Sequence, residues 1–201
     1  VHALTRSVTN RLTKTSDTLP PMLVLMSAVD ATVSVNAVVN RLLRPLANEK
    51  NELVLFDINR QALVAPLLVS NAAPIAEELL GDQVLPFDLG VVRNSQPDSG
   101  TVSITRKPAG TVTAHTQPLG LDWPAGTLSL SHVALPFPPD DPLYGRTPPP
   151  GSQRIFLGQV PLQGERGMLR IPVDALLRLR HNPFHDFLVK RALTWLDLDQ
   201  D

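Results

Sequence analysis

The stretch "PPMLVLMSAVDATVSVNAVVNRLLRPLANEKNELVLFDINR", residues 20–60, decides the expected fold. It begins with a continuous apolar run, 20–30, bounded by prolines, which is typical of a strand buried on both faces of a sheet. Residues 32–50 place apolar side chains at helical spacing, and Pro45 should bend or shorten the last turn of that helix. A second apolar run with polar flanks, 51–60, predicts another buried strand. Strand, helix and strand with short connections predict a right-handed crossover between parallel strands.

The sequence pattern changes after residue 60. The runs 84–92, 101–106, 111–117 and 127–133 look like short strands, and turn formers such as "NSQPDSG", "KPAG" and "DWPAG" separate them. This alternation is typical of antiparallel β structure. We also expect helices over 2–15, 74–80, 173–180 and 183–197, and a hairpin formed by 154–160 and 167–171.

Composition limits the classes to which the protein can belong. The chain has 201 residues, of which 43% are hydrophobic, so it can bury the core of one domain or slightly more. Its net charge of −1 offers no basic field to hold nucleic acid, and its longest apolar stretch, 19–29, is too short to span a bilayer. The absence of cysteine excludes disulfides and thiolate metal sites. We expect no cofactor.

Asp30 and His132 are the candidate catalytic residues. Asp30 directly follows the first buried strand, and the carboxyl ends of parallel strands are where ligands and catalytic groups gather. The alternative role for Asp30 is an N-cap of the helix that begins near Thr32. His132 ends the alternating run "TLSLSH" and can act as a general base if a carboxylate orients its ring. Its alternative role is that of a solvent-facing or core histidine at a strand end.

The remaining acids have mainly structural interpretations. Asp57, at the end of the second strand, could serve as an alternative acid, but we expect it to cap or to pair with Arg60. Asp140 and Asp141 in "PPDDPLYG" are expected to organise a proline-rich turn through Asx-type hydrogen bonds, with cleft lining as the alternative.

The other histidines carry no catalytic expectation. The residues around His115 resemble those around His132, but no special loop follows His115. We expect His115 to lie far from Asp30. His2, His181 and His185 lie on expected helices or at their ends, which predicts surface or capping roles. A metal at His181 and His185 is rejected, because a proline breaks "HNPFH" and no third ligand is near in sequence.

Two stretches resemble the C-terminal half of α/β-hydrolase-fold serine hydrolases. "PPMLVLMSAVDATVSVNAVVNRLLRPLANEKNELVLFD" is similar to the acid strand, acid turn, helix and following strand of that family. "LSLSHVALPFPPDDPLYG" resembles the histidine loop of its esterase and lysophospholipase-like bacterial members. The resemblance covers 20–58 and 127–145, and 183–197 more weakly. It implies the α/β class, as the C-terminal part of an α/β-hydrolase-type parallel sheet with an inserted β-rich subdomain.

The resemblance also assigns roles. It implies Asp30 as the acid and His132 as the general base of a Ser-Asp-His triad, in the chain order of this fold. The serine and the oxyanion hole would lie upstream, because no G-x-S-x-G occurs in the 201 residues and the chain begins too late to contain that turn. Asp30 and His132 lie 102 positions apart, more than in most members, and we interpret the excess as the insertion.

These features divide the chain into a strand-helix-strand unit with the acid (1–60), a β-rich insertion (61–126), and the histidine loop, hairpin and C-terminal helices (127–201). The expected function is hydrolysis of a small-molecule or lipid-like carboxylic ester. The alternative is a non-catalytic β-rich interaction module on a degenerate hydrolase frame. An apolar strand at 22–27 without its upstream neighbour should pair with the missing half or a second copy, or be covered by 1–18.

Overall fold

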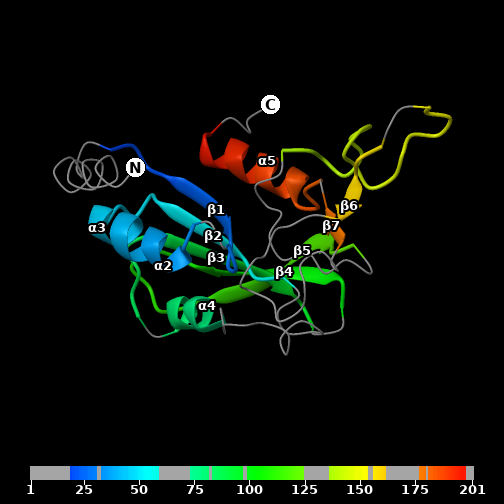
Figure 1. Ribbon diagram of the computed structural model, residues 1–201. Coiled ribbons are helices and arrows are strands. Elements are labelled where there is room, and N and C mark those ends of the chain that lie inside the picture. The colour runs from blue at the N-terminus through cyan, green and yellow to red at the C-terminus, as the bar shows by residue number, and fades with distance from the viewer. Residues whose placement is uncertain are drawn as a thin grey trace.

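The computed structural model describes residues 19–30, 33–58, 73–81, 83–96, 99–124, 136–153, 156–161, 177–179 and 181–197. The strands are β1 (Leu23–Ser27), β2 (Glu52–Phe56), β3 (Asp88–Asn94), β4 (Thr101–Lys107), β5 (His115–Asp122), β6 (Gln159–Pro161) and β7 (Leu177–Leu179). The helices are α2 (Val35–Val38), the π-helical segment η2 (Val39–Leu43), α3 (Arg44–Leu46), α4 (Ala73–Leu80) and α5 (His185–Trp195). Figure 1 shows their arrangement.

One mixed sheet organises the fold. Its order is β1-β2-β3-β4-β5, with β1, β2 and β3 parallel and with antiparallel pairing from β3 to β4 and from β4 to β5. The α/β class and the predicted strand-helix-strand unit at 20–58 are therefore confirmed. The strands β3, β4 and β5 come from the range 61–126, and they continue the sheet of β1 and β2.

Helices cover both faces of the sheet. Figure 1 shows α2, α3 and α4 on one side and α5 on the other. The alternation of β2 follows these layers: Leu53 and Leu55 belong to the core under α2 and α4, whereas Val54 and Phe56 belong to the core under α5. All five residues of β2 are buried, which explains its continuous apolar sequence. In β1, only Met26 and Ser27 are buried, because β1 is the outer strand of the described sheet.

The helical connection between β1 and β2 shows the effect of its proline. The side chain of Ser34 accepts a hydrogen bond from the backbone N–H of Ala37 and so caps the first turn. Pro45 cannot donate a backbone hydrogen bond, and the turn before it is π-helical, with the N–H of Arg44 bonded to the carbonyl of Val39. The helix ends at Ala47, which adopts a left-handed conformation with φ of 42°.

The buried Lys107 holds the end of α4. Its Nζ donates hydrogen bonds to the carbonyl oxygens of Leu79 at 3.1 Å, Gly81 at 2.5 Å and Gln83 at 2.7 Å. These carbonyls lie at or just beyond the C-terminus of α4, where the helix has no internal donors left and where its dipole favours a positive charge. Lys107 thereby fastens α4 to β4 across the core.

The C-terminal part differs from the sequence-based expectation in one element. Residues 177–179, expected within a helix over 173–180, form the strand β7, which pairs antiparallel with β6. The run "LRL" alternates apolar and polar residues, so its pattern fits a strand as well as a helix turn. The predicted helices at 74–80 and 183–197 are confirmed as α4 and α5. The expected elements at 2–15, 127–133 and 167–171 lie outside the described residues.

Candidate active site at the carboxyl edge of the sheet

The parallel strands β1, β2 and β3 end at one edge of the sheet, formed by 27–30, 56–58 and 92–94, which we call the carboxyl edge. Backbone hydrogen bonds hold it together: the N–H of Ala28 donates to the carbonyl of Phe56 at 3.0 Å, and that of Asp57 donates to the carbonyl of Val92 at 2.8 Å. Three residues with ionisable side chains lie here, namely Asp30, Asp57 and Arg93. This is the edge at which open parallel sheets place their ligands.

Asp30 lies in the turn directly after β1. Its backbone N–H donates to the carbonyl of Ser27 at 3.3 Å, and its Oδ1 accepts the N–H of Val33 at 3.0 Å. This second bond closes the turn that precedes α2, whose N-cap is Ser34, so Asp30 does not have the N-cap role that was its alternative. A carboxylate can accept several hydrogen bonds at once, so the bond to Val33 is compatible with further roles of this side chain. His132 lies outside the described residues.

Asp57 belongs to an ion-pair network. Its side chain is 1% exposed, and its Oδ2 accepts a hydrogen bond from Nε of Arg93 at 3.1 Å. Arg93 also approaches Glu77 of α4, with Nη2 at 2.9 Å from Oε1. Asp57 therefore pairs with an arginine, as expected, but this arginine is Arg93 of β3. The expected partner, Arg60, lies outside the described residues. A buried carboxylate held in this way ties β2 to β3 and α4.

An aromatic cluster lies beside this edge, on the α5 face. Phe184 packs against Phe56 with ring centroids 4.9 Å apart and against Trp123 at 5.9 Å. Trp123 follows β5, which runs in the same direction as β3 because two antiparallel pairings separate them. The start of α5, the end of β2 and the end of β5 therefore converge at one place.

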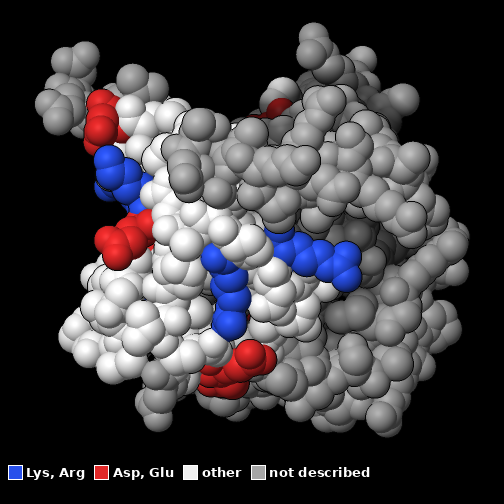
Figure 2. Space-filling model, turned by 90° about the vertical axis from the view of Figure 1, so that its left-hand side faces the viewer, with Lys and Arg blue, Asp and Glu red and all other residues white. Residues whose placement is uncertain are grey.

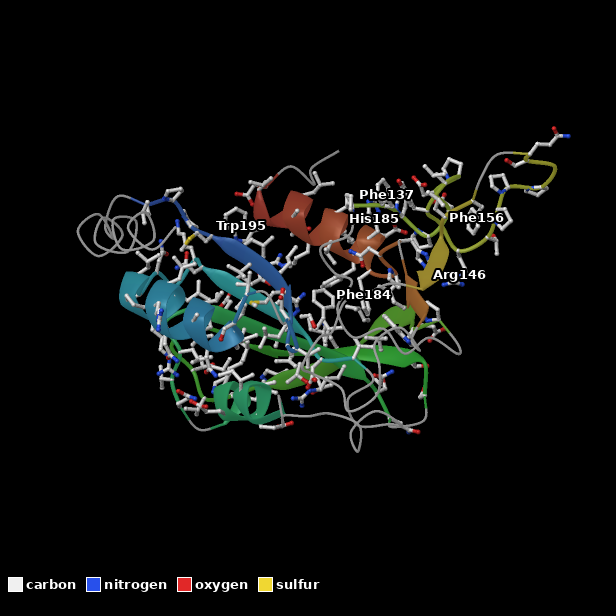
Figure 3. The ribbon with its side chains drawn as sticks, in the orientation of Figure 1. Phe137, Arg146, Phe156, Phe184, His185 and Trp195 are labelled. Atoms are coloured by element: carbon white, nitrogen blue, oxygen red, sulfur yellow. The ribbon has the colours of Figure 1, made fainter. Side chains whose placement is uncertain are left out.

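Asn182 connects the next segment to this cluster. Its backbone N–H donates to the carbonyl of Phe137 at 2.8 Å, and its Oδ1 accepts the N–H of Phe184 at 2.9 Å. Figure 3 shows Phe137 and His185 at this end of α5, with Trp195 at the other end. Trp123 and Phe137, which stand on either side of the range 125–135, are thus both tied to the beginning of α5.

The loop after Phe137 is compact. Asp141 accepts the N–H groups of Leu143 at 2.9 Å and Tyr144 at 2.7 Å through Oδ1, so the prediction that it organises the turn is confirmed. The ring of Tyr144 stacks on Phe137 with centroids 4.3 Å apart. A Cβ on Gly145 would lie 2.4 Å from the carbonyl oxygen of Asp141, so only glycine fits this close approach.

His181 lies beneath this loop, and the sequence-based assignment to a surface or capping role was wrong. It is fully buried, and burial, followed by the neighbouring positive charge of Arg146, lowers the pKa of its imidazole. The backbone of Tyr144 and Gly145 acts in the opposite direction on this pKa. The ring is therefore neutral at pH 7. In the sequence, only the Asn-Pro pair that follows His181 and precedes α5 indicated that the position of this side chain is fixed.

The remaining described histidines lie away from Asp30 or at the surface. His115 begins β5 and is separated from β1 by three strands, which agrees with the expectation that it is remote from Asp30. His185 begins α5, with Nδ1 at 3.4 Å from Oδ1 of Asp186. Among the described residues, no group of three or more His, Cys, Asp or Glu side chains is placed to hold a metal ion.

Two further properties concern the surface and the membrane. On the face that Figure 2 shows, acidic and basic residues are interspersed, so the described part of that face has no continuous field of one sign. None of the helices that the structure describes has the length and apolar character needed to cross a bilayer. Comparisons with models of protein families, with curated proteins and with solved structures give no match to this chain.

Proposed function

We propose that this chain is the C-terminal part of a serine hydrolase that acts on carboxylic esters, in which Asp30 and His132 serve a nucleophilic serine from an upstream segment. The observation that carries the proposal is the position of Asp30 at the carboxyl end of β1, in a sheet whose first three strands are parallel. Catalytic groups of open α/β sheets lie at this edge.

The proposed reaction follows the logic of a catalytic triad. His132 takes the proton of the serine hydroxyl as the serine oxygen attacks the ester carbonyl carbon, and then gives that proton to the departing alcohol. Water repeats the cycle on the acyl-enzyme and releases the carboxylic acid. Asp30 accepts the second ring N–H of His132, which fixes its tautomer and stabilises the imidazolium that forms in each step. The substrate is a small-molecule or lipid-like ester.

The surroundings of His132 support this pairing. The described residues on either side of it, Trp123 and Phe137, are both tied to the start of α5, beside the last residue of β2. Phe56 in turn accepts the backbone bond from Ala28, two positions before Asp30.

The second candidate function is a non-catalytic interaction module, and one observation favours it. Oδ1 of Asp30 accepts the N–H of Val33, so this carboxylate has a sufficient structural role without catalysis. The two functions differ in whether Asp30 also interacts with His132.

The decisive substitution is Asp30→Asn in protein with 15N-labelled histidine. The amide oxygen of asparagine can accept the Val33 N–H in the same turn, so this change keeps that hydrogen bond and removes only the charge. Without the carboxylate, protonated His132 loses its stabilising partner, and its NMR titration should move to lower pH by about one unit. Asp57→Asn is the control for the alternative acid, and His132→Gln assigns the signal.

An unchanged His132 titration in the Asp30→Asn protein, or a shift only in Asp57→Asn, would refute the triad assignment. A second expectation concerns activity. The 201-residue chain by itself should neither hydrolyse esters nor form a covalent adduct with a serine-directed phosphonate, because the nucleophile and the oxyanion donors would be upstream. Stoichiometric labelling of one of its own serines would contradict the proposal.

A further inference from the structure

His181 is a buried titratable residue that the proposed ester hydrolysis does not use. Its side chain is fully buried, and among the described residues neither ring nitrogen has a hydrogen-bond partner of normal geometry. A neutral imidazole has one N–H donor, whereas an imidazolium has two and a full positive charge. Because burying a charge without partners is costly, this position accepts the neutral ring and opposes the protonated one.

The charges around the ring act in the same sense. Burial, followed by the positive charge of Arg146, lowers the pKa of the His181 imidazole. The acids of the adjoining segments are directed elsewhere. Asp141 bonds to backbone amides of its own turn, Asp140 is exposed, and the side chain of Asp186 is 88% exposed. Protonation would therefore place a second positive charge beside Arg146 with no described carboxylate directed at the ring.

The loop over His181 is a compact unit, residues 137–146, which we call the covering loop. It lies outside the five-stranded sheet, beside the start of α5 (Figure 1). Its turns are closed by bonds within the loop: the N–H of Gly145 donates to the carbonyl of Asp141 at 2.9 Å, and that of Arg146 donates to the carbonyl of Pro139 at 2.6 Å. A surface loop closed by its own bonds can keep its internal structure when it moves.

Few bonds attach the covering loop to its surroundings. Among the described residues, two backbone hydrogen bonds join it to the chain outside. The N–H of Asn182 donates to the carbonyl of Phe137 at 2.8 Å, and the N–H of Leu157 donates to the carbonyl of Leu143 at 2.8 Å. Neither bond involves a strand of the sheet. The loop can therefore separate from the start of α5 by a local opening that leaves the sheet intact.

We propose that His181 is an acid-sensitive switch, whose protonation releases the covering loop from the start of α5 while the five-stranded sheet stays folded. Release gives the imidazolium access to water and moves the loop, with Arg146, away from it. This inference does not depend on the proposed ester hydrolysis.

Linkage gives the size of the effect. The released imidazole binds a proton with its ordinary pKa of 6.5, whereas the covered imidazole binds a proton less readily. Opening therefore takes up one proton, and its equilibrium constant should rise about tenfold for each pH unit below the ordinary pKa of the ring. The rise ends where the covered form is protonated as well.

Hydrogen exchange of the full chain, followed by NMR between pH 7.5 and pH 5, tests the switch. The amides of Asn182 and Leu157 donate the two attaching bonds, and their protection factors should fall about tenfold per pH unit once the pH is below the ordinary pKa of the ring. The amide of Leu55, at the centre of β2, should keep a much higher protection factor at every pH. Protection of the two loop-facing amides that does not change with pH would overturn the proposal. Protection equal to that of Leu55 would do the same, because the loop would then open only with the whole fold.

Two variants separate His181 from other acid-sensitive groups. His181→Met removes the titration, so the protection factors of Asn182 and Leu157 should no longer fall between pH 6.5 and pH 5. His185→Gln removes an imidazole four positions later and should keep the tenfold slope. An unchanged slope in His181→Met, or its loss in His185→Gln, would refute the assignment to His181.

A second measurement uses the chain without substitution, so it does not depend on the folding of a variant. Tyr144 is the only tyrosine of the chain, and 3-fluorotyrosine therefore gives one fluorine NMR signal from the covering loop. This signal should change in acid with the same midpoint as the ring protons of His181, because one event controls both. A signal that is constant from pH 7.5 to pH 5, or two distinct midpoints, would show that the loop does not respond to this histidine.

Discussion

Arg191 and Glu52, 139 positions apart in the sequence, form a bidentate ion pair that fixes α5 on the sheet. Nε of Arg191 donates to Oε1 of Glu52 at 2.8 Å, and Nη2 donates to Oε2. The Glu52 side chain is only 3% exposed, and Nη1 of Arg106 is 3.5 Å from its Oε1. The hydrogen bond to Glu52 is the main cause that raises the pKa of Arg191, so the guanidinium stays charged.

We expect the two single substitutions in this pair to differ in cost. Arg191→Met leaves Glu52 buried with only the longer contact to Arg106, and it should lower the free energy of unfolding by about 3–5 kcal/mol. Glu52→Gln should cost less, because Arg191 is 20% exposed and can turn toward water. Urea denaturation of both variants measures the difference.

The double variant Glu52→Gln/Arg191→Met is the control for this pair. Removing both charges should recover part of the loss, because no buried carboxylate then remains without its partner. Additive effects of the two substitutions would show that the pair contributes no coupling energy, contrary to its bidentate geometry.

Lys107 gives a second prediction about a buried charge. Lys107→Met keeps the length of the side chain but leaves the carbonyls of Leu79, Gly81 and Gln83 without their shared donor. Unfolding should become easier by about 1–3 kcal/mol, the usual cost of unsatisfied buried acceptors. The amides of α4 should also lose protection from hydrogen exchange relative to those of β1 and β2. A variant with wild-type stability would mean that these carbonyls find other donors.

The sequence predicted the elements whose pattern is local. The apolar runs at 20–30 and 51–60 and the helical spacing between them correspond to β1, β2 and the helix from α2 to α3. The Asx turn at Asp141 was also predictable, because the bonds join neighbours in the chain. The pairing of β3 with β2 was not, because a strand pattern does not specify its neighbour and residues 84–92 could have started a separate sheet.

Long-range contacts account for what the sequence did not predict at the candidate site. Asp57 pairs with Arg93, 36 positions away, and His181 is buried by a loop that precedes it by more than 30 positions. The local sequence suggested a cap or a pair with Arg60 for Asp57, and a surface or capping role for His181. Asp30 was predictable as a residue at the carboxyl end of a strand, but the N-cap of the following helix is Ser34 and not Asp30. Its relation to His132 stays a prediction.

The loop that covers His181 depends on a glycine. A Cβ on Gly145 would lie 2.4 Å from the carbonyl oxygen of Asp141 and 2.6 Å from that of Pro139, so Gly145→Ala must displace the turn. Tyr144 is the only tyrosine of the chain, and near-ultraviolet circular dichroism should therefore report the loss of its stacking on Phe137. Gly81→Ala, which meets its nearest neighbour at 3.3 Å, is the control and should leave this signal unchanged. An intact tyrosine signal in Gly145→Ala would show that the turn can absorb a methyl group.

His181 makes the stability of this corner depend on pH. Burial and the charge of Arg146 lower the pKa of its imidazole below the ordinary value of 6.5, so in acid the unfolded chain binds a proton more readily than the folded one. The contribution of neutral His181 to stability is complete above about pH 6.5 and is lost as the pH falls below that value, until the folded form is protonated as well.

The measurement is the free energy of unfolding between pH 8 and pH 4.5, together with the Tyr144 signal of the covering loop. The variant His181→Met keeps an apolar side chain of similar length and removes the titration, so the fall in stability between pH 6.5 and pH 5 should become shallower than in the wild type. His185→Gln, four positions later at the start of α5, is the matched control, because it removes an imidazole that is partly exposed and lies outside the buried position of His181. Identical slopes in the wild type and in His181→Met would contradict this prediction. They would mean that groups other than His181 cause the loss of stability in acid.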